Sequence, residues 1–315
     1  MKIFDLHCDT LGKALDEDKD LISRDFHVNI EKGLGYDAWV QCFAIFIPDE
    51  YRGNGAVELF NRAKDKLQNE AEKFKSKIKV CKHPNDLKNY DKNKCNIIFT
   101  VEGGAALGGE IKNLEHLYKA GVKMMTLTWN GRCEIGDGIK VENPKGLTEF
   151  GLNVVKKMED LKMVIDISHA SDALFYDVME KTKSPLAASH SNSRTICNNK
   201  RNLTDEQFKE IMHRGGIVGI NFCRYFLNSN DNPTISDIIK HVEHFLSLGG
   251  EKSVCLGADF DGAAMPDEIS GVESLGKIYE AFLRLGYSQR LLQDIFFNNA
   301  YNFFLNFWDI NTNNR

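Results

Sequence analysis

The sequence lacks long apolar runs and contains few prolines. No window approaches the ~18 to 20 uninterrupted apolar residues of a membrane-spanning helix. Near the start, Asp5, His7 and Asp9 interrupt the short hydrophobic stretch, so no secretory signal is visible. Six prolines leave little room for an extended linker, and no internal repeat divides the chain. We therefore expect a single domain over residues 1–315 that is cytoplasmic and has no membrane partner.

A basic stripe and closely paired cysteines are also lacking. The 40 basic and 45 acidic residues are spread along the chain and give a net charge of -5, without the basic patch that phosphate backbones require. None of the eight cysteines forms a C-x-x-C pair. In a chain of this length without a secretory signal, cysteines usually stay reduced and pack as small hydrophobic residues. We expect neither a nucleic-acid partner nor a disulfide framework.

What the sequence does contain is an alternation of short apolar runs with longer stretches of helical period. Brief runs rich in β-branched and aromatic residues are typical of buried parallel strands. The predicted strands cover residues 3–7, 39–46, 96–101, 123–128, 163–167, 185–188, 216–221 and 253–257. The predicted helices cover residues 57–74, 113–120, 148–161, 173–182, 204–214, 236–248 and 275–285.

This alternation predicts an α/β fold with a parallel sheet, either open and doubly wound or closed into a (β/α)8 TIM barrel. The positions of the polar residues favour the barrel. His, Asp and Glu recur at or just beyond the C-terminal ends of the predicted strands, which is the face where barrel enzymes carry their chemistry. We expect a metal site on that face.

Five of these strand ends carry side chains that can bind a metal ion or move a proton. In chain order they are His7 and Asp9 after the first strand, Glu102 at the third, His169 after the fifth, His190 after the sixth and Asp259 after the eighth. Histidine nitrogens and carboxylate oxygens are ligands that zinc accepts. One carboxylate shared between two metal ions about 3.5 Å apart allows a bridging water of lowered pKa, as amide hydrolysis requires.

A structural role is the alternative for each of these residues. Any one histidine can be a satisfied core or capping residue, but their joint occurrence at strand ends makes this interpretation weaker for the set. The other histidines lie in loops or on helical patterns, where we expect structural roles only. They are His27, His83, His116, His213, His241 and His244.

These motifs, in this order, resemble the membrane (renal) dipeptidase family, in its bacterial soluble branch, within the metal-dependent amidohydrolase barrels. The match runs nearly end to end. It includes DLHCD at 5–9, EGG at 102–104, LT at 127–128, DISH at 166–169, SHS at 189–191, KRN at 200–202 and GADFDG at 257–262. The resemblance implies a zinc-dependent dipeptidase that acts on short peptides, L-L and also L-D.

The resemblance also implies the metal ligands. His7 and Asp9 would bind the first of two zinc ions, His169 and His190 would bind the second, and Glu102 would bridge them. Because oxygen-rich mixed sites accept several metals, manganese or cobalt are alternatives to zinc. A bridging hydroxide would then attack the scissile carbonyl.

Two further residues match family positions that act on the substrate. Asp259 matches the proton-transfer residue, which would deliver a proton to the leaving amine. Arg201 matches an arginine that holds the substrate's terminal carboxylate, a task suited to a planar guanidinium. The alternative for Arg201 is a surface ion pair.

The sequence departs from the family at Trp129, where the renal enzymes carry a histidine that steadies the tetrahedral intermediate. An indole cannot replace that charge. Trp129 can donate one N–H and the adjacent Asn130 can offer an amide donor, so we expect both to contact the substrate. Loss of one such donor typically costs ~100-fold or more in rate.

Two other functions stay open from sequence alone. One is another amidohydrolase-type activity, on a lactam or an N-acyl amino acid. The other is a non-catalytic metal-binding barrel, which Trp129 favours but the retained Asp259 and paired metal ligands do not. The preferred dipeptide, the native metal and the physiological role are not encoded in these patterns. Family members are often dimers, which leaves a homodimer open here, and the sequence does not decide the oligomeric state.

Overall fold

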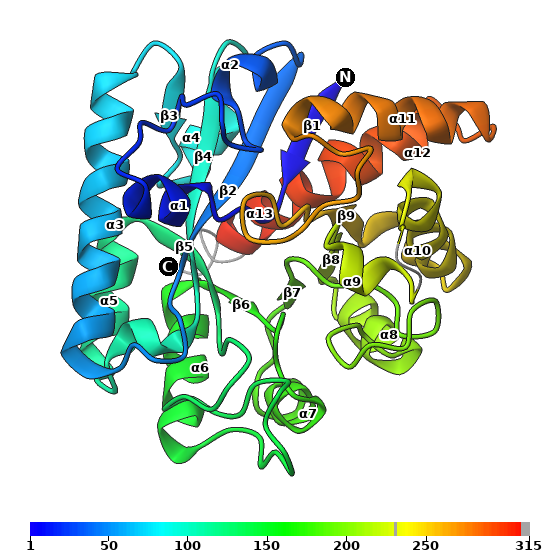
Figure 1. The fold of residues 1–315 in the computed structure, drawn as a ribbon. Helices are drawn as coiled ribbons and strands as arrows, with labels where there is room; N and C mark the ends of the chain where they lie inside the picture. Colours follow the sequence, from blue (N-terminus) through cyan, green and yellow to red (C-terminus); the bar gives the residue numbers. More distant parts are fainter. Residues whose placement is uncertain (230–231, 310–315) are drawn as a thin grey trace.

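Eight parallel strands form a closed barrel in the computed structural model, which describes residues 1–229 and 232–309 (Figure 1). The order around the barrel is β2-β1-β9-β8-β7-β6-β5-β4, and β2 pairs with β4 to close it. The barrel strands are β1 (Lys2–Asp5), β2 (Ala38–Phe46), β4 (Cys95–Glu102), β5 (Val122–Thr126), β6 (Val164–Asp166), β7 (Ala187–Ala188), β8 (Ile217–Ile220) and β9 (Val254–Leu256). The predicted (β/α)8 barrel is confirmed.

One short strand lies outside this ring. β3 (Ile78–Val80) pairs with the first residues of β4, next to Cys95 to Ile97, while β5 begins to pair with β4 only at Phe99. β3 therefore covers the edge of β4 at the N-terminal end of the barrel, away from the ends of the strands that carry the polar residues.

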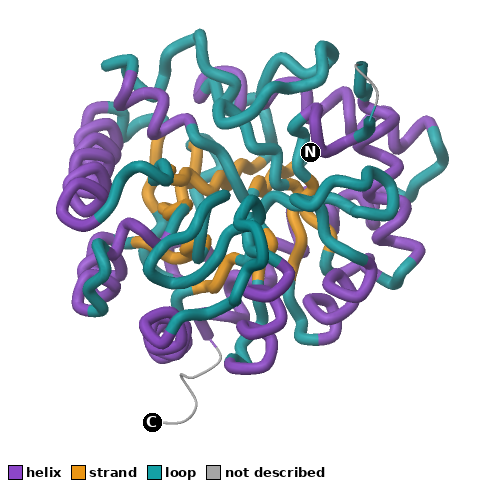
Figure 2. Tube along the Cα trace, turned by 60° about the horizontal axis from the view of Figure 1, so that its bottom comes forward, coloured by secondary structure: helices purple, strands orange, loops and turns teal. Residues whose placement is uncertain are grey.

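Helices surround the strands, as the tube in Figure 2 shows. The α-helices are α1 (Thr10–Asp16), α2 (Ile30–Gly33), α3 (Gly53–Lys73), α4 (Pro84–Lys88), α5 (Lys112–Ala120), α6 (Glu149–Leu161), α7 (Asp172–Lys181), α8 (Asp205–His213), α9 (Arg224–Leu227), α10 (Ile235–Ser247), α11 (Leu275–Arg284), α12 (Gln289–Gln293) and α13 (Asn299–Asp309). Short 3-10 turns occur at η1 (Gly104–Leu107), η2 (Gly250–Lys252) and η3 (Val272–Ser274), and η4 (Asp294–Asn298) is a π-helical turn. No helix among the described residues is long and apolar enough to cross a membrane.

The core has two layers because side chains alternate between the two faces of each strand. One layer lies between the strands and the outer helices and includes Trp39, Phe43 and Phe99. The other contains one or more residues of every barrel strand and packs against the C-terminal helical segment, which consists of η4 and α13. There the ring of Phe4 stacks on that of Phe304, with centroids 5.5 Å apart. The C-terminal segment thus fills the N-terminal end of the barrel and leaves the opposite end open for a site.

Parallel pairing places the C-terminal ends of all eight strands at the same end of the barrel. Glu102 is the last residue of β4, and His7, His169, His190 and Asp259 follow β1, β6, β7 and β9 within a few residues. His169 and Asp259 have φ values of 65° and 64°, a left-handed conformation that non-glycine residues rarely adopt and that tends to mark functional sites.

Candidate metal centre

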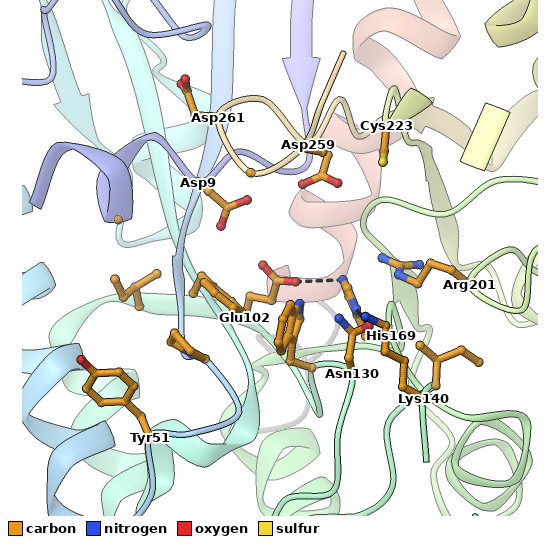
Figure 3. Close-up of a pocket in the computed structure, with 18 of the residues that line it drawn as sticks. Asp9, Tyr51, Glu102, Asn130, Lys140, His169, Arg201, Cys223, Asp259 and Asp261 are labelled. Atoms are coloured by element: carbon orange, nitrogen blue, oxygen red, sulfur yellow. Dashed lines mark hydrogen bonds and ion pairs between the residues drawn. The ribbon is translucent and has the colours of Figure 1, made fainter. Parts of the chain in front are cut away.

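The polar side chains predicted at the strand ends meet in one pocket of about 1590 Å³. Figure 3 shows Glu102 near its centre, with Asp9 and Asp259 on one side and His169 and Arg201 on another. His7 and His190 lie beneath the pocket floor, each 1% exposed. The residues that line the pocket include Asp9, Glu102, Trp129, Asn130, His169, Arg201 and Asp259.

Glu102 contacts three histidines through its two carboxylate oxygens. Oε1 lies 2.9 Å from His169 Nε2 and 3.7 Å from His190 Nε2, whereas Oε2 lies 3.3 Å from His7 Nε2. Burial favours the neutral acid, but these histidines outweigh it and hold the pKa of Glu102 well below its usual range. Glu102 is therefore a charged, buried carboxylate with one oxygen turned toward each side of the site.

His7 and Asp9 form the first side. His7 Nε2 lies 3.2 Å from Asp9 Oδ2 and 3.8 Å from Asp259 Oδ1. Burial opposes a positive charge on His7, but Asp9 and Glu102 overcome it and raise the pKa of His7 well above its usual value. Burial and the charge of Glu102 raise the pKa of Asp9 to about 7, although His7 opposes this shift. The carboxylates here create a strong preference for positive charge.

One buried oxygen on the side of His7 and Asp9 has no partner. Oδ1 of Asp9 is buried and has no hydrogen-bond partner. A buried carboxylate oxygen without a donor costs free energy unless a cation or another donor reaches it. The donor set around Asp9 consists of histidine nitrogen and carboxylate oxygen, which fits a divalent cation.

His169 and His190 form the second side, with their Nε2 atoms 3.0 Å apart. Burial, then the charges of His7 and Arg201, lower the pKa of His190 well below its usual value. Burial and Arg201 also lower the pKa of His169. Two neutral imidazoles that turn their lone pairs toward one point repel each other, and a cation at that point removes the repulsion.

The separations as a whole suit metal coordination. Ligand atoms ~2.0–2.1 Å from a tetrahedral zinc lie roughly 3.3 Å from one another. The five separations given above among His7, Asp9, Glu102, His169 and His190 fall between 2.9 and 3.7 Å. The residues present therefore fit a divalent metal on each side of Glu102.

The second nitrogen of each of these two histidines contacts an oxygen. His169 Nδ1 lies 3.1 Å from Oδ1 of Asn130, and His190 Nδ1 lies 2.7 Å from Oγ of Ser189. Such outer contacts fix ring orientation and decide which nitrogen carries the hydrogen. Asn130, predicted as a substrate contact, thus also contacts a predicted metal ligand.

Asp259 lies beside the first side of the site and is held by Asn221. Nδ2 of Asn221 donates to Asp259 Oδ2 across 3.0 Å and also contacts the backbone oxygen of His190 at 3.3 Å. Asp259 is 8% exposed and lines the pocket. Its carboxylate is anchored at one oxygen, with the other facing His7.

Arg201 is buried in the pocket wall and not in an ion pair at the surface. Its Nη1 donates to Ser191 Oγ at 2.9 Å and its Nη2 to the backbone oxygen of His190 at 3.0 Å, while Nε has no partner. No carboxylate lies within ion-pair distance of Arg201 in the described part of the chain. The surface ion-pair alternative is therefore wrong. The guanidinium is buried beside the pocket, and the carboxylates of Asp259, Glu102 and Asp166 stabilise its charge only from beyond ion-pair distance.

Trp129 is half-buried and lines the pocket. Its ring meets that of Phe46 edge-on, with centroids 4.7 Å apart, and lies 6.3 Å from the ring of His169. The indole nitrogen has no hydrogen-bond partner among residues 1–229 and 232–309. Trp129 therefore gives the pocket an aromatic surface and one free donor.

The comparison with known families agrees with this geometry. The sequence profile of the membrane dipeptidase family (peptidase family M19) matches residues 1–310. The chain belongs to the membrane dipeptidase family. It is accordingly a hydrolase of the metallo-dipeptidase class, and the family implies a divalent metal in the site.

Individual relatives differ in how much of their length the chain matches. An uncharacterised protein of Klebsiella pneumoniae from the pqqA 5′ region is 35% identical over 66% of this chain and 80% of its own length. Dipeptidase 3 of mouse is 28% identical over 81% of this chain. That match spans 52% of the mouse protein, so about half of its length has a counterpart here.

Solved structures of dipeptidases have the same fold. Dipeptidase AC, a metallopeptidase of family M19, superposes with a TM-score of 0.91 at 25% identity over 98% of this chain and 99% of its own. A metallopeptidase of Rhodobacter sphaeroides, solved with a phosphinate mimic of L-Ala-D-Ala, also gives 0.91, at 24% identity over 98% of this chain and 99% of its own.

The sequence did not predict the buried polar residues that lie outside the pocket lining and hold side chains of the site by hydrogen bonds. Asn221, Ser189 and Asp166 carry no predicted role, although Ser189 and Asp166 belong to the matched motifs. All three are fully buried and polar, which in retrospect is a signal, because buried polar groups need partners. Their partners come from other strands, and a single sequence does not pair them.

The histidines predicted to be structural lie away from the pocket lining. His241 is fully buried: Nδ1 accepts from the Ser193 backbone N–H at 3.1 Å, and Nε2 lies 2.9 Å from the Leu227 backbone oxygen. Both nitrogens of His241 are therefore satisfied, as a core residue requires.

Proposed function

We propose that this protein hydrolyses dipeptides with two zinc ions held at the C-terminal end of the barrel. The observation that carries the proposal is the division of Glu102, whose Oε1 faces His169 and His190 while Oε2 faces His7. A carboxylate that serves two ligand groups at once is the feature expected of a bridge between two ions.

The ligand assignment follows from this division. His7 and Asp9 would hold one ion, His169 and His190 the other, and Glu102 both. The unpartnered Oδ1 of Asp9 supports a cation on the first side. The close approach of the His169 and His190 nitrogens supports one on the second. Ions bound there would polarise the scissile carbonyl and activate water for attack.

Asp259 is positioned to move the proton. Amide hydrolysis requires a proton on the leaving nitrogen, and general acid–base catalysis of this kind contributes ~10²–10⁴-fold. Because Asn221 holds Oδ2, Oδ1 of Asp259 is the oxygen free to accept a proton from water and pass it to the amine.

Arg201 would bind the terminal carboxylate of the substrate. Its buried guanidinium has no carboxylate partner of its own, and Nε is unsatisfied, so a substrate carboxylate would complete it. A site that captures a free carboxylate next to the scissile bond excludes long chains. This supports dipeptides, L-L and L-D, over longer peptides.

The N-terminal residue of the dipeptide would then lie toward the aromatic wall. Figure 3 shows Tyr51 and Arg201 on opposite sides of Glu102. Phe46, Tyr51 and Trp129 all line the pocket, and the rings of Phe46 and Trp129 are in contact. The free indole N–H of Trp129 and the amide nitrogen of Asn130, which has no partner in the described chain, would donate to the substrate oxygen.

The cytoplasm is the compartment we propose for this activity. All eight cysteines are buried and none forms a disulfide. Buried free thiols of this number suit a reducing compartment.

Metal content per chain, measured by elemental analysis together with amino-acid release from L-L and L-D dipeptides, tests the proposal. Two zinc equivalents and cleavage that a chelator abolishes are expected. A metal-free chain that neither cleaves dipeptides nor changes with chelator would overturn it. N-acetylated and amidated dipeptides serve as matched substrates that lack one terminal charge each.

A further inference from the structure

Behind the second side of the site lies a chain of hydrogen bonds that runs from His190 through Ser189 to Asp166. Ser189 Oγ is 2.7 Å from His190 Nδ1 and 2.5 Å from Asp166 Oδ2. All three residues are at most 1% exposed, so water does not compete for these contacts.

Asp166 accepts hydrogen bonds at both of its oxygens. Oδ1 receives the backbone N–H groups of Ser168 at 3.0 Å and Ser189 at 2.9 Å. Oδ2 receives the hydroxyl of Thr126 at 2.7 Å besides that of Ser189. Four donors on one carboxyl group suit an ionised carboxylate, which accepts only. The group is thereby fixed in place by β5, β6 and β7.

The direction of the hydrogen bonds follows from this. Ser189 has one hydroxyl hydrogen, and the charged Asp166 oxygen at 2.5 Å takes it in preference to Ser168 Oγ at 3.4 Å. Ser189 Oγ then offers only lone pairs to His190. The contact of 2.7 Å can be a hydrogen bond only if Nδ1 of His190 carries the hydrogen.

We propose that Ser189 and Asp166 act as positioning residues that fix the tautomer of His190, with hydrogen on Nδ1 and a free lone pair on Nε2. This lone pair faces Glu102 and His169, where the proposed function places an ion. The effect of the tautomer on metal binding therefore rests on the proposed function. Ser189 and Asp166 thus hold the His190 ring in the tautomer that binds metal before any metal arrives.

Zinc affinity of Ser189→Ala tests the proposal, measured by competition with a chromophoric chelator. Loss of a hydrogen bond that orients a metal ligand typically weakens metal binding ~10–100-fold, and we expect that range for the ion on the side of His169 and His190. Ser171→Ala is the matched control, since it removes a buried hydroxyl that caps α7 and does not touch His190. Zinc bound by Ser189→Ala as tightly as by Ser171→Ala overturns the proposal.

A second measurement applies even if Ser189→Ala fails to fold. ¹⁵N-histidine spectra of the wild-type chain, zinc-loaded and metal-free, report which ring nitrogen of His190 carries hydrogen. Hydrogen on Nδ1 in both forms supports the proposal, and hydrogen on Nε2 in the metal-free form contradicts it. If the wild-type chain binds no zinc, the proposed function fails, while the metal-free spectrum still decides the role of Ser189 and Asp166.

Discussion

Asn221 donates its side-chain amide to one carboxylate oxygen of Asp259 across 3.0 Å, and this bond decides which oxygen of Asp259 faces the site. The free oxygen, Oδ1, lies 3.8 Å from His7 Nε2. Asp259 itself adopts a left-handed backbone conformation, with φ at 64°. A rarely adopted backbone conformation thus places one carboxylate oxygen of Asp259 where the proposed mechanism requires a proton to move.

Asp259→Asn is expected to lower kcat ~100-fold or more, because an amide cannot accept and release the proton. Zinc content should stay at two per chain, since the predicted ligands are intact. Steady-state rates on a dipeptide, with elemental analysis of the same sample, check both. Unchanged kcat would remove Asp259 from the proton pathway.

Glu102→Gln is expected to lower zinc content from two ions toward one. Gln keeps the shape of the side chain but offers a single acceptor atom, so only one side of the site retains an oxygen ligand from residue 102. Glu70→Gln is the control, as Glu70 is another buried glutamate, on α3, that lies outside the pocket. Full metal content in Glu102→Gln would contradict a bridging role.

Arg201→Ala is expected to raise KM ~10–100-fold for dipeptides with a free C-terminus, because a charge-assisted hydrogen bond worth roughly 1.5–3 kcal/mol is lost. Dipeptide amides should change little. Lys200→Ala controls for a general loss of positive charge, since Lys200 is an exposed neighbour that also lines the pocket. Equal losses on both kinds of substrate would mean that Arg201 does not recognise the carboxylate.

Trp129→Phe separates the two roles of the indole. Phenylalanine keeps an aromatic ring against Phe46 but has no N–H, so a role as oxyanion donor predicts a kcat lower by ~100-fold with KM nearly unchanged. Single-turnover rates on one dipeptide provide the measurement. If kcat is retained, Trp129 acts only as part of the pocket wall.

His241 predicts a loss of stability in acid. Burial lowers its pKa to about 4 from the model-compound value of 6.5, so the folded state excludes a proton that the unfolded chain binds. The contribution of neutral His241 to the free energy of unfolding is full above about pH 6.5 and is lost as the pH falls toward 4. The loss amounts to about 3 kcal/mol. Urea unfolding at both ends of this range measures it.

His241→Gln should show a smaller acid-induced loss than the wild-type chain, because glutamine does not titrate. His213→Gln, at an exposed position on α8, should behave like the wild type. The same acid-induced loss in all three proteins would assign it to other groups.

The eight barrel strands could be predicted from the sequence because strands buried on both faces appear as short apolar runs. β3 was missed, since Ile78–Val80 is three residues long and partly buried. The C-terminal helix α13 was missed although its pattern is helical, with Phe303, Phe304, Phe307 and Trp308 buried and Asn302 and Asn306 exposed.

The site was predictable where a motif and a strand end coincide. His7, Glu102, His169 and Asp259 lie together in the structure as the strand-end argument requires. What the sequence could not give is the burial of Arg201 without a counter-ion. Nor could it give the pairing of Asn221 with Asp259, which joins residues 38 positions apart through the packing of the barrel.

The order in which the chain is made has a bearing on the metal centre. The residues of the candidate metal centre extend from His7 to Asp259, and Glu102, His169 and His190 lie between them in the sequence. While the chain is being synthesised, a ribosome-bound fragment that stops short of β9 holds several ligands yet cannot close the barrel around them. In the proposed function, metal loading would follow closure of the barrel, so the ions would bind a folded chain and not a growing one.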